Sequence, residues 1–103
     1  MPPRTTVHVH LQEGFEMERV IVSIDDTVVL DDPTVRTKTQ IGLARIFEAD
    51  TTADAISVHV ELAGRHETAT LTLRPNATPY VGVSVSDSGQ VEFRTQAEPF
   101  GYV

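Results

Sequence analysis

The sequence contains no cysteine and no tryptophan among its 103 residues. Without cysteine the chain forms no disulfide framework, offers no thiol nucleophile and builds no thiolate-ligated zinc site. Such a composition is more natural in a reducing compartment than outside the cell. Aromatic residues make up only 6% of the chain, and the absence of tryptophan argues against a sugar-binding surface on which pyranose rings stack.

Basic residues and long apolar runs are also scarce. The 8 Lys and Arg face 15 Asp and Glu, which gives a formal net charge of −7. An acidic surface repels phosphate groups, so nucleic acid and anionic membrane are poor partners. No stretch reaches the length of a membrane span, and the first ten residues lack the apolar core of a signal peptide. We therefore expect a soluble, cytoplasmic protein.

The length and composition are those of one globular domain. Hydrophobic residues account for 40% of the chain and charged residues for 22%, which is ordinary globular usage and argues against disorder. A chain of this size buries enough apolar surface to be stable without disulfides or a metal. We expect a single domain spanning residues 1–103.

Alternation of apolar and polar residues is the dominant pattern. Val7, Val9 and Leu11 alternate with His8 and His10. This period of two predicts a strand with one apolar and one polar face. The same pattern recurs in five further segments: 20–24, 56–62, 69–73, 81–85 and 91–93. Turn-forming residues separate the segments at intervals of about 8 to 12 residues, as in sandwiches and barrels.

One polar face per strand favours antiparallel sheets, since parallel strands have continuous apolar runs and need crossover helices. The sequence therefore predicts an all-β fold, an immunoglobulin-like two-sheet antiparallel β-sandwich of about seven to eight strands. Residues 20–30 resemble the strand, acidic turn, strand unit of small immunoglobulin-like and carbohydrate-binding-like sandwiches, although Asp26 stands where Gly is usual. The resemblance is confined to this unit and assigns no family.

Residues 36–50 fit two patterns. As a strand, Ile41, Leu43 and Phe47 share a face, and Arg45 interrupts it. As a helix, Leu43, Ile46 and Phe47 cluster, but Gly42 and the threonines before it disfavour helix initiation by about 1 kcal/mol. We favour a strand.

Two acidic turns are expected, at Asp25-Asp26 and at Asp31-Asp32-Pro33. The first fits either a primed or a type I hairpin turn. Calcium needs several oxygen ligands in one place, supplied either by one turn with another loop or by both turns. An extended segment 27–30 would hold them about 17 to 20 Å apart, too far for one ion. We interpret both as turns and expect no cofactor.

Histidines supply the one candidate metal site. His8 and His10 are two residues apart on a strand, so their side chains point to the same face. His59 and Glu61 are similarly placed on a second strand, and the four side chains together would suit a zinc or nickel ion. In an immunoglobulin-like order another strand separates the two, a gap of about two strand spacings of 4.8 Å. The alternative, polar residues on a solvated face, is the preferred interpretation.

No catalytic constellation is visible in the sequence. The serines lie on predicted strands or in a hairpin, and none is surrounded by a nucleophile elbow. A sandwich of this size also has little room for a deep cleft. We expect the protein not to be an enzyme.

The C-terminal segment 98–103 follows the last strand and carries Phe100 and Tyr102, two of the six aromatic residues. Either it folds back to cover an open end of the sandwich, or it presents both rings to a partner. Edge strands offer a second route to association, including a homodimer. The preferred hypothesis is a non-enzymatic binding or assembly module that acts through a sheet edge, its loops or this aromatic tail on a protein partner or a second copy. The alternative is a metal-binding protein that uses the strand histidines.

Overall fold

Eight strands make up the regular structure in the computed structural model, which describes residues 4–38 and 40–101. They are β1 (Thr5–Leu11), β2 (Glu16–Ile24), β3 (Thr27–Arg36), β4 (Arg45–Thr51), β5 (Ile56–Leu62), β6 (Glu67–Leu73), β7 (Tyr80–Val85) and β8 (Val91–Gln96). These two ranges contain no helix. All six strands predicted from alternation are confirmed.

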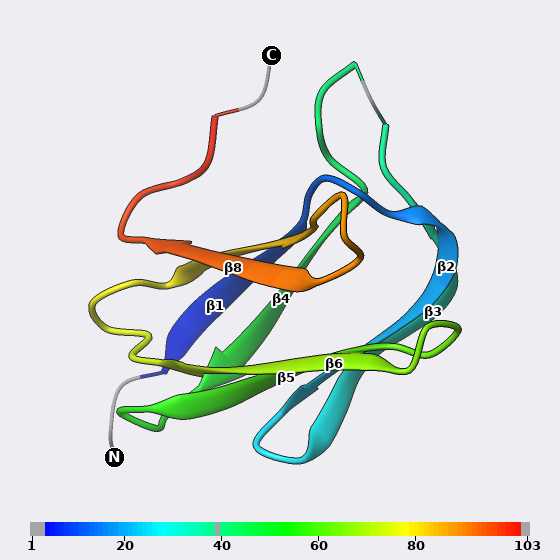
Figure 1. The fold of residues 1–103 in the computed structure, drawn as a ribbon. Coiled ribbons are helices and arrows are strands. Elements are labelled where there is room, and N and C mark those ends of the chain that lie inside the picture. The colour runs from blue at the N-terminus through cyan, green and yellow to red at the C-terminus, as the bar shows by residue number, and fades with distance from the viewer. Residues whose placement is uncertain (1–3, 39, 102–103) are drawn as a thin grey trace.

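The strands form two four-stranded sheets that pack face to face (Figure 1). Sheet A has the order β4-β1-β7-β8, and sheet B has the order β3-β2-β5-β6. The expected all-β, two-sheet sandwich of about eight strands is therefore confirmed. Its immunoglobulin-like connectivity remains a prediction.

The core lies between the sheets and follows the alternation in the sequence. Val7, Val9 and Leu11 of β1 have no exposed surface, and neither do Val81 and Val83 of β7. The intervening residues point to the outer face of each sheet, because successive side chains of a strand alternate sides. Sheet B contributes a matching set, which comprises Val20, Val22, Leu30, Val35, Ile56, Val58, Val60, Leu62 and Leu73.

One strand pair departs from the antiparallel arrangement that we expected. β1 runs parallel to β7, with His8 opposite Tyr80 and Leu11 opposite Val83. The expectation assumed that a parallel pair needs a crossover helix. Here the chain between the two strands instead builds β4 and all of sheet B, so no helix is required. Sheet A is therefore mixed.

The segment Asp31-Asp32-Pro33 is not the turn that we expected, because it lies inside β3. The pairing of β2 with β3 contains three register shifts. Such bulges bend a strand pair, and Figure 1 shows β2 and β3 curving around one side of the molecule. The Asp32 carboxylate accepts a hydrogen bond from Thr34 N at 3.0 Å within this irregular part of the strand.

Residues 36–50 are divided between a loop and a strand. β3 ends at Arg36, a bridge joins Lys38 to Leu43, and β4 begins at Arg45. The preferred strand is thus confirmed from Arg45 onward. Arg45 is tolerated at this position because its guanidinium lies 2.9 Å from the Asp32 carboxylate on β3 and joins the two sheets.

The backbone is left-handed at Asp25 and Asp26, in the β2–β3 turn, and at Gly14, in the β1–β2 connection. Asp25 and Asp26 have φ angles of 48° and 68°, which fits a primed hairpin turn. The Asp25 carboxylate accepts a hydrogen bond from Ser57 N at 2.8 Å. Gly14 has a φ of 88°, and a Cβ there would lie 1.9 Å from the carbonyl oxygen of Val85. Only glycine therefore fits at position 14, in the connection between β1 and β2.

Candidate functional site

The outer face of sheet A carries a cluster of aromatic and imidazole rings, here called the aromatic cluster: His8, His10, Tyr80 and Phe100. His8 and Tyr80 are direct partners across the β1–β7 pair, and their rings stack with centroids 4.5 Å apart and an interplanar angle of 10°. The Tyr80 ring meets His10 edge-on at 6.4 Å. Such offset and edge contacts are the favoured geometries of aromatic pairs.

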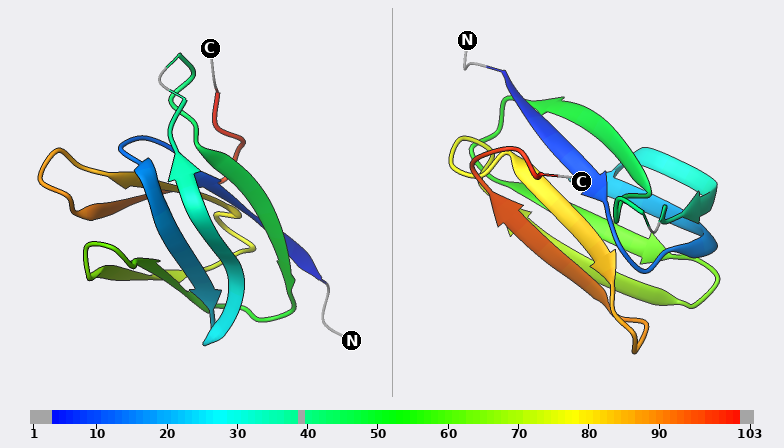
Figure 2. Two further views of the ribbon diagram at one scale, coloured as in Figure 1. Left: turned by 90° about the vertical axis from the view of Figure 1, so that its right-hand side faces the viewer. Right: turned by 90° about the horizontal axis from the view of Figure 1, so that it is seen from above.

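Phe100 joins this cluster because the chain folds back after β8. Seen from above sheet A, the C-terminal segment crosses from the end of β8 over β7 towards β1 (Figure 2). The Phe100 ring lies 5.2 Å from that of His10 and meets Tyr80 at 90°. The guanidinium of Arg94 lies 5.6 Å from its centroid, within range of a cation–π interaction. Gln96 fixes the bend by donating to Glu98 O at 2.8 Å.

Of the two alternatives for the tail, the structure therefore places Phe100 on the protein itself. It covers the outer face of sheet A, however, and not an open end of the sandwich. Tyr102, the second expected partner-binding residue, lies outside the described residues.

Burial changes the acid–base behaviour of His10. Although it points away from the core, the residue is only 7% exposed, because Tyr80 and Phe100 lie beside it. This desolvation, together with the neighbouring His8, holds the pKa of His10 below its ordinary value of 6.5. His8 is more exposed, and its Nδ1 lies 3.4 Å from the Glu48 carboxylate of β4.

Beside the aromatic cluster the same face forms an open groove of about 440 Å³, here called the sheet A groove. Gly82 forms the floor of the groove, and the Gln12 side chain packs directly against this glycine. A Cβ at residue 82 would lie 2.5 Å from Gln12 Oε1, so a larger residue there would have to displace the Gln12 side chain. Ser84, Glu92 and Arg94 add a hydroxyl, a carboxylate and a guanidinium. Phe100 and Gly101 of the tail and Ile41 and Gly42 of the β3–β4 loop complete the lining.

The four residues of the alternative metal site do not come together. His8 and His10 lie on the outer face of sheet A, whereas His59 and Glu61 lie on β5 in sheet B, with the core between them. His59 is hydrogen-bonded through Nδ1 to Thr70 Oγ1 at 2.7 Å. Across residues 4–38 and 40–101, no three His, Cys, Asp or Glu residues are arranged to hold a metal ion.

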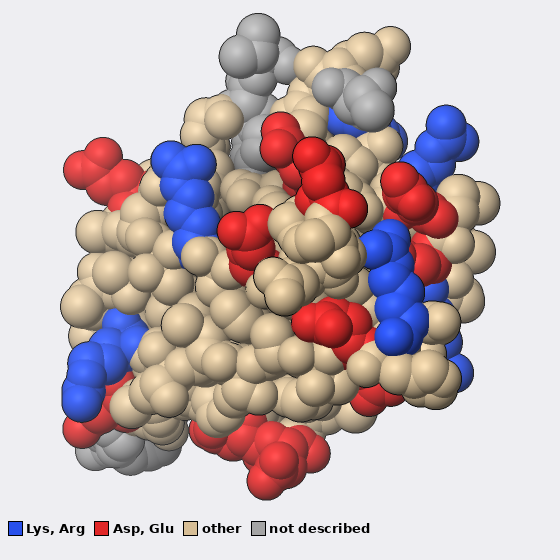
Figure 3. Space-filling model, viewed as in Figure 1, with Lys and Arg blue, Asp and Glu red and all other residues tan. Residues whose placement is uncertain are grey.

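The acidic pair Asp31-Asp32 is likewise engaged with protein groups. Asp31 is bound by the guanidinium of Arg19 at 2.8 and 2.9 Å, a bidentate pair. The hydrogen bond from Arg19 lowers the pKa of Asp31 below its ordinary value. Asp32 pairs with Arg45. Figure 3 shows Lys and Arg dispersed among Asp and Glu on one face of the molecule.

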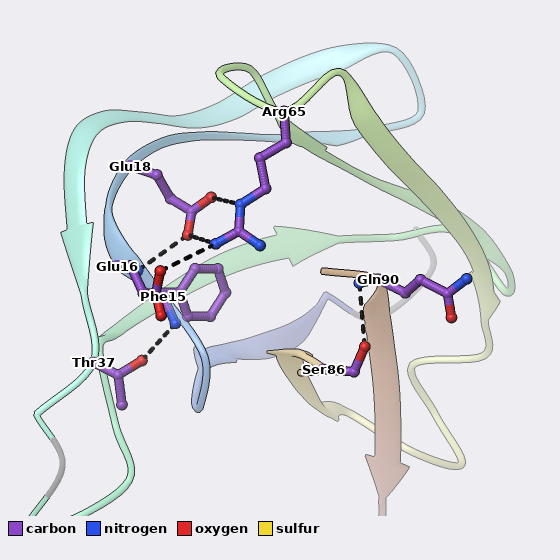
Figure 4. Close-up of polar contacts among 7 residues, drawn as sticks. All are labelled: Phe15, Glu16, Glu18, Thr37, Arg65, Ser86 and Gln90. Carbon is purple, nitrogen blue, oxygen red and sulfur yellow. Dashed lines mark hydrogen bonds and ion pairs between the residues drawn. The ribbon is translucent and has the colours of Figure 1, made fainter. Parts of the chain in front are cut away.

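A second polar site, an ion pair between Glu18 and Arg65, was not predicted from the sequence. The carboxylate of Glu18, only 10% exposed, receives the guanidinium of Arg65 at 2.9 and 3.0 Å (Figure 4). Glu18 Oε2 also accepts from Glu16 N at 3.1 Å. A bulge at Met17, whose φ is 56°, shapes this end of β2. The sequence did indicate that Glu18 is partly buried, since it lies two residues before the core residue Val20 and therefore on the same side of the strand.

Together these features define a small, all-β sandwich. Its candidate functional site is the sheet A groove, with the aromatic cluster and the tail beside it. No protein-family model matches the chain, and a search of curated proteins gave no match. Within the described ranges no helix is both long and apolar enough to cross a membrane.

Proposed function

We propose that the protein is a non-enzymatic, cytoplasmic binding module that takes an extended segment of a partner protein in the sheet A groove, against the Phe100 ring. The observation that supports this is the tail itself, because a segment of chain without regular structure already lies on this face. The face thus accommodates an irregular segment anchored by one aromatic ring.

The groove chemistry suits a peptide. Gln12, Ser84 and Arg94 line it and provide donors and acceptors for peptide carbonyl and amide groups. Phe100 and Ile41 provide apolar contact at its sides. Recognition sites of this kind combine an apolar anchor with a few placed polar groups.

A peptide-display selection on the full chain tests the proposal. Selected peptides are expected to shift the amide NMR signals of Ser84 and Arg94, and not those of Thr68 to Thr72 on the outer face of sheet B. Phe100→Ala is expected to weaken their binding by about tenfold. Val28→Ala serves as the matched control, because Val28 is 58% exposed on β3 of the other sheet.

Two results would overturn the proposal. One is a set of selected peptides whose shifts map to sheet B or to the hairpin loops. The other is binding that is equally weakened by Phe100→Ala and Val28→Ala, which would show that the tail and the groove have no special part in it.

A further inference from the structure

Three of the four edge strands carry features that hinder pairing with a second copy. Two of the register shifts in the β2–β3 pairing place an extra residue in β3, and the strand also carries Pro33; both features interrupt a regular ladder. Self-pairing of β4 about its middle residue would place Glu48 against Glu48. β6 carries Glu67 on its core-facing side, opposite the buried Leu62, and inward charges of this kind also protect an edge.

The edge of β8 lacks such features. Its six residues pair with β7 without a shift, from Tyr80 opposite Gln96 to Val85 opposite Val91. The hairpin closes with Ser86 N donating to Gln90 O at 2.9 Å. Because hydrogen-bonded pairs alternate along an antiparallel ladder, even-numbered residues of β8 bond to β7 and odd-numbered residues direct their N–H and C=O groups outward. No described strand lies on that side.

We propose that β8 pairs antiparallel with β8 of a second copy, about a two-fold axis at Phe93, and so joins two copies of sheet A into one sheet. In this register Phe93 faces Phe93, and Val91 faces Thr95. All three residues belong to the outward-directed set, so each of these pairs is hydrogen-bonded. The proposal goes beyond the peptide groove, because it concerns a second copy of the chain and the backbone edge of β8, although Glu92 and Arg94 also line the groove.

The charges of β8 complement one another in the same register. Glu92 of one copy faces Arg94 of the other, and the two-fold axis repeats this contact. Both pairs are of the non-hydrogen-bonded type, in which side chains approach most closely. Both residues are exposed and point to the outer face of the sheet.

Apolar surface at this side of the sandwich favours the same partner. Val91 and Phe93 of β8 and Leu71 of the neighbouring β6 pack against the core but are only partly buried. A second copy would cover them. The tail leaves this edge open, because it crosses over β7 and does not run beside β8 (Figure 2).

A charge exchange tests the dimer in the intact chain. Light scattering behind a size-exclusion column is expected to give twice the chain mass of 11.3 kDa for the natural protein at high concentration. Glu92→Arg and Arg94→Glu are each expected to weaken the dimer by tenfold or more, because each creates two like-charge contacts across the two-fold axis. The double variant, with both changes, is expected to dimerise again. Asp54→Arg, in the exposed β4–β5 loop, is the control for net charge.

A proline variant separates the dimer from the groove. Thr95→Pro removes an outward N–H and leaves the bonds to β7 in place, as edge positions allow. It is expected to be monomeric and to bind selected peptides as the natural protein does, whereas Thr95→Ala is expected to remain dimeric. A monomeric natural protein at several hundred micromolar, or a double variant no more dimeric than either single one, would overturn the proposal.

Discussion

Replacing Phe100 with alanine probes the contacts that hold the tail on sheet A. The half-buried ring loses about 1 kcal/mol of apolar burial, half of what a fully buried Phe provides. Its contacts with His10, Tyr80 and Arg94 add about 1 kcal/mol together. We therefore expect Phe100→Ala to lower the free energy of unfolding by about 2 kcal/mol, or the melting temperature by about 8 °C for a domain of this size.

The same change should restore the ordinary acidity of His10. The pKa of this imidazole is lowered chiefly by burial, and loss of the Phe100 ring exposes it, so its pKa should rise towards 6.5 in an NMR titration. A folded pKa below the unfolded one means that the unfolded chain binds more protons, so stability falls as the pH drops below about 6.5. This acid sensitivity should be weaker in Phe100→Ala.

Phe100→Leu is the matched control for these two measurements. Leucine keeps most of the apolar cover but lacks the ring, so it should retain the lowered pKa of His10 and lose about 1 kcal/mol of stability. The reasoning would be refuted if Phe100→Ala changed neither the melting temperature nor the pKa of His10, since the tail would then not cover the ring in solution.

Three further changes test the backbone and the second polar site. Gly14→Ala should destabilise the fold by about 3 kcal/mol or more in urea unfolding, because its Cβ would overlap the Val85 carbonyl and its φ is left-handed. Asp26→Gly should stabilise it by about 0.5 kcal/mol, because glycine is favoured at the second position of a primed turn; a loss of stability would contradict the assigned turn. Arg65→Met should cost about 2 kcal/mol by leaving the buried Glu18 carboxylate without its partner, and adding Glu18→Gln should recover part of that loss in a double-mutant cycle.

The strands of the core could be predicted because their alternation reflects burial directly. Val7, Val9 and Leu11 are fully buried, as their spacing predicted. The direction of pairing could not be predicted, because a strand with one wet face alternates in the same way in parallel and antiparallel pairs. The bulges of β3 could not be predicted from the sequence either. Asp31 and Asp32 favour turns by local chemistry, but in the folded chain they lie in a strand and pair with Arg19 and Arg45.

The candidate site was only partly accessible from the sequence. The aromatic residues near the C-terminus indicated that the tail has a role. The alternation in β1 predicted that His8 and His10 lie on the polar face of their strand, and this is the face on which Phe100 lies. Strand order decided the rest, because it placed His59 on the opposite face and brought Tyr80 and Gly82 beside β1. A glycine between Val81 and Val83 is the one local signal for the groove floor, and it becomes informative only when Gln12 is known to lie above it.

The parallel pair of β1 and β7 also sets the order in which the molecule can assemble. The four strands of sheet B all lie between Glu16 and Leu73, so they can pair before the last third of the chain is available. β1 must wait for β7, which follows it by about seventy residues, and closing so long a loop loses much chain entropy before any contact compensates. We expect completion of sheet A to limit the folding rate, with an early species that is structured in sheet B and leaves the inner edge of β1 without a neighbour.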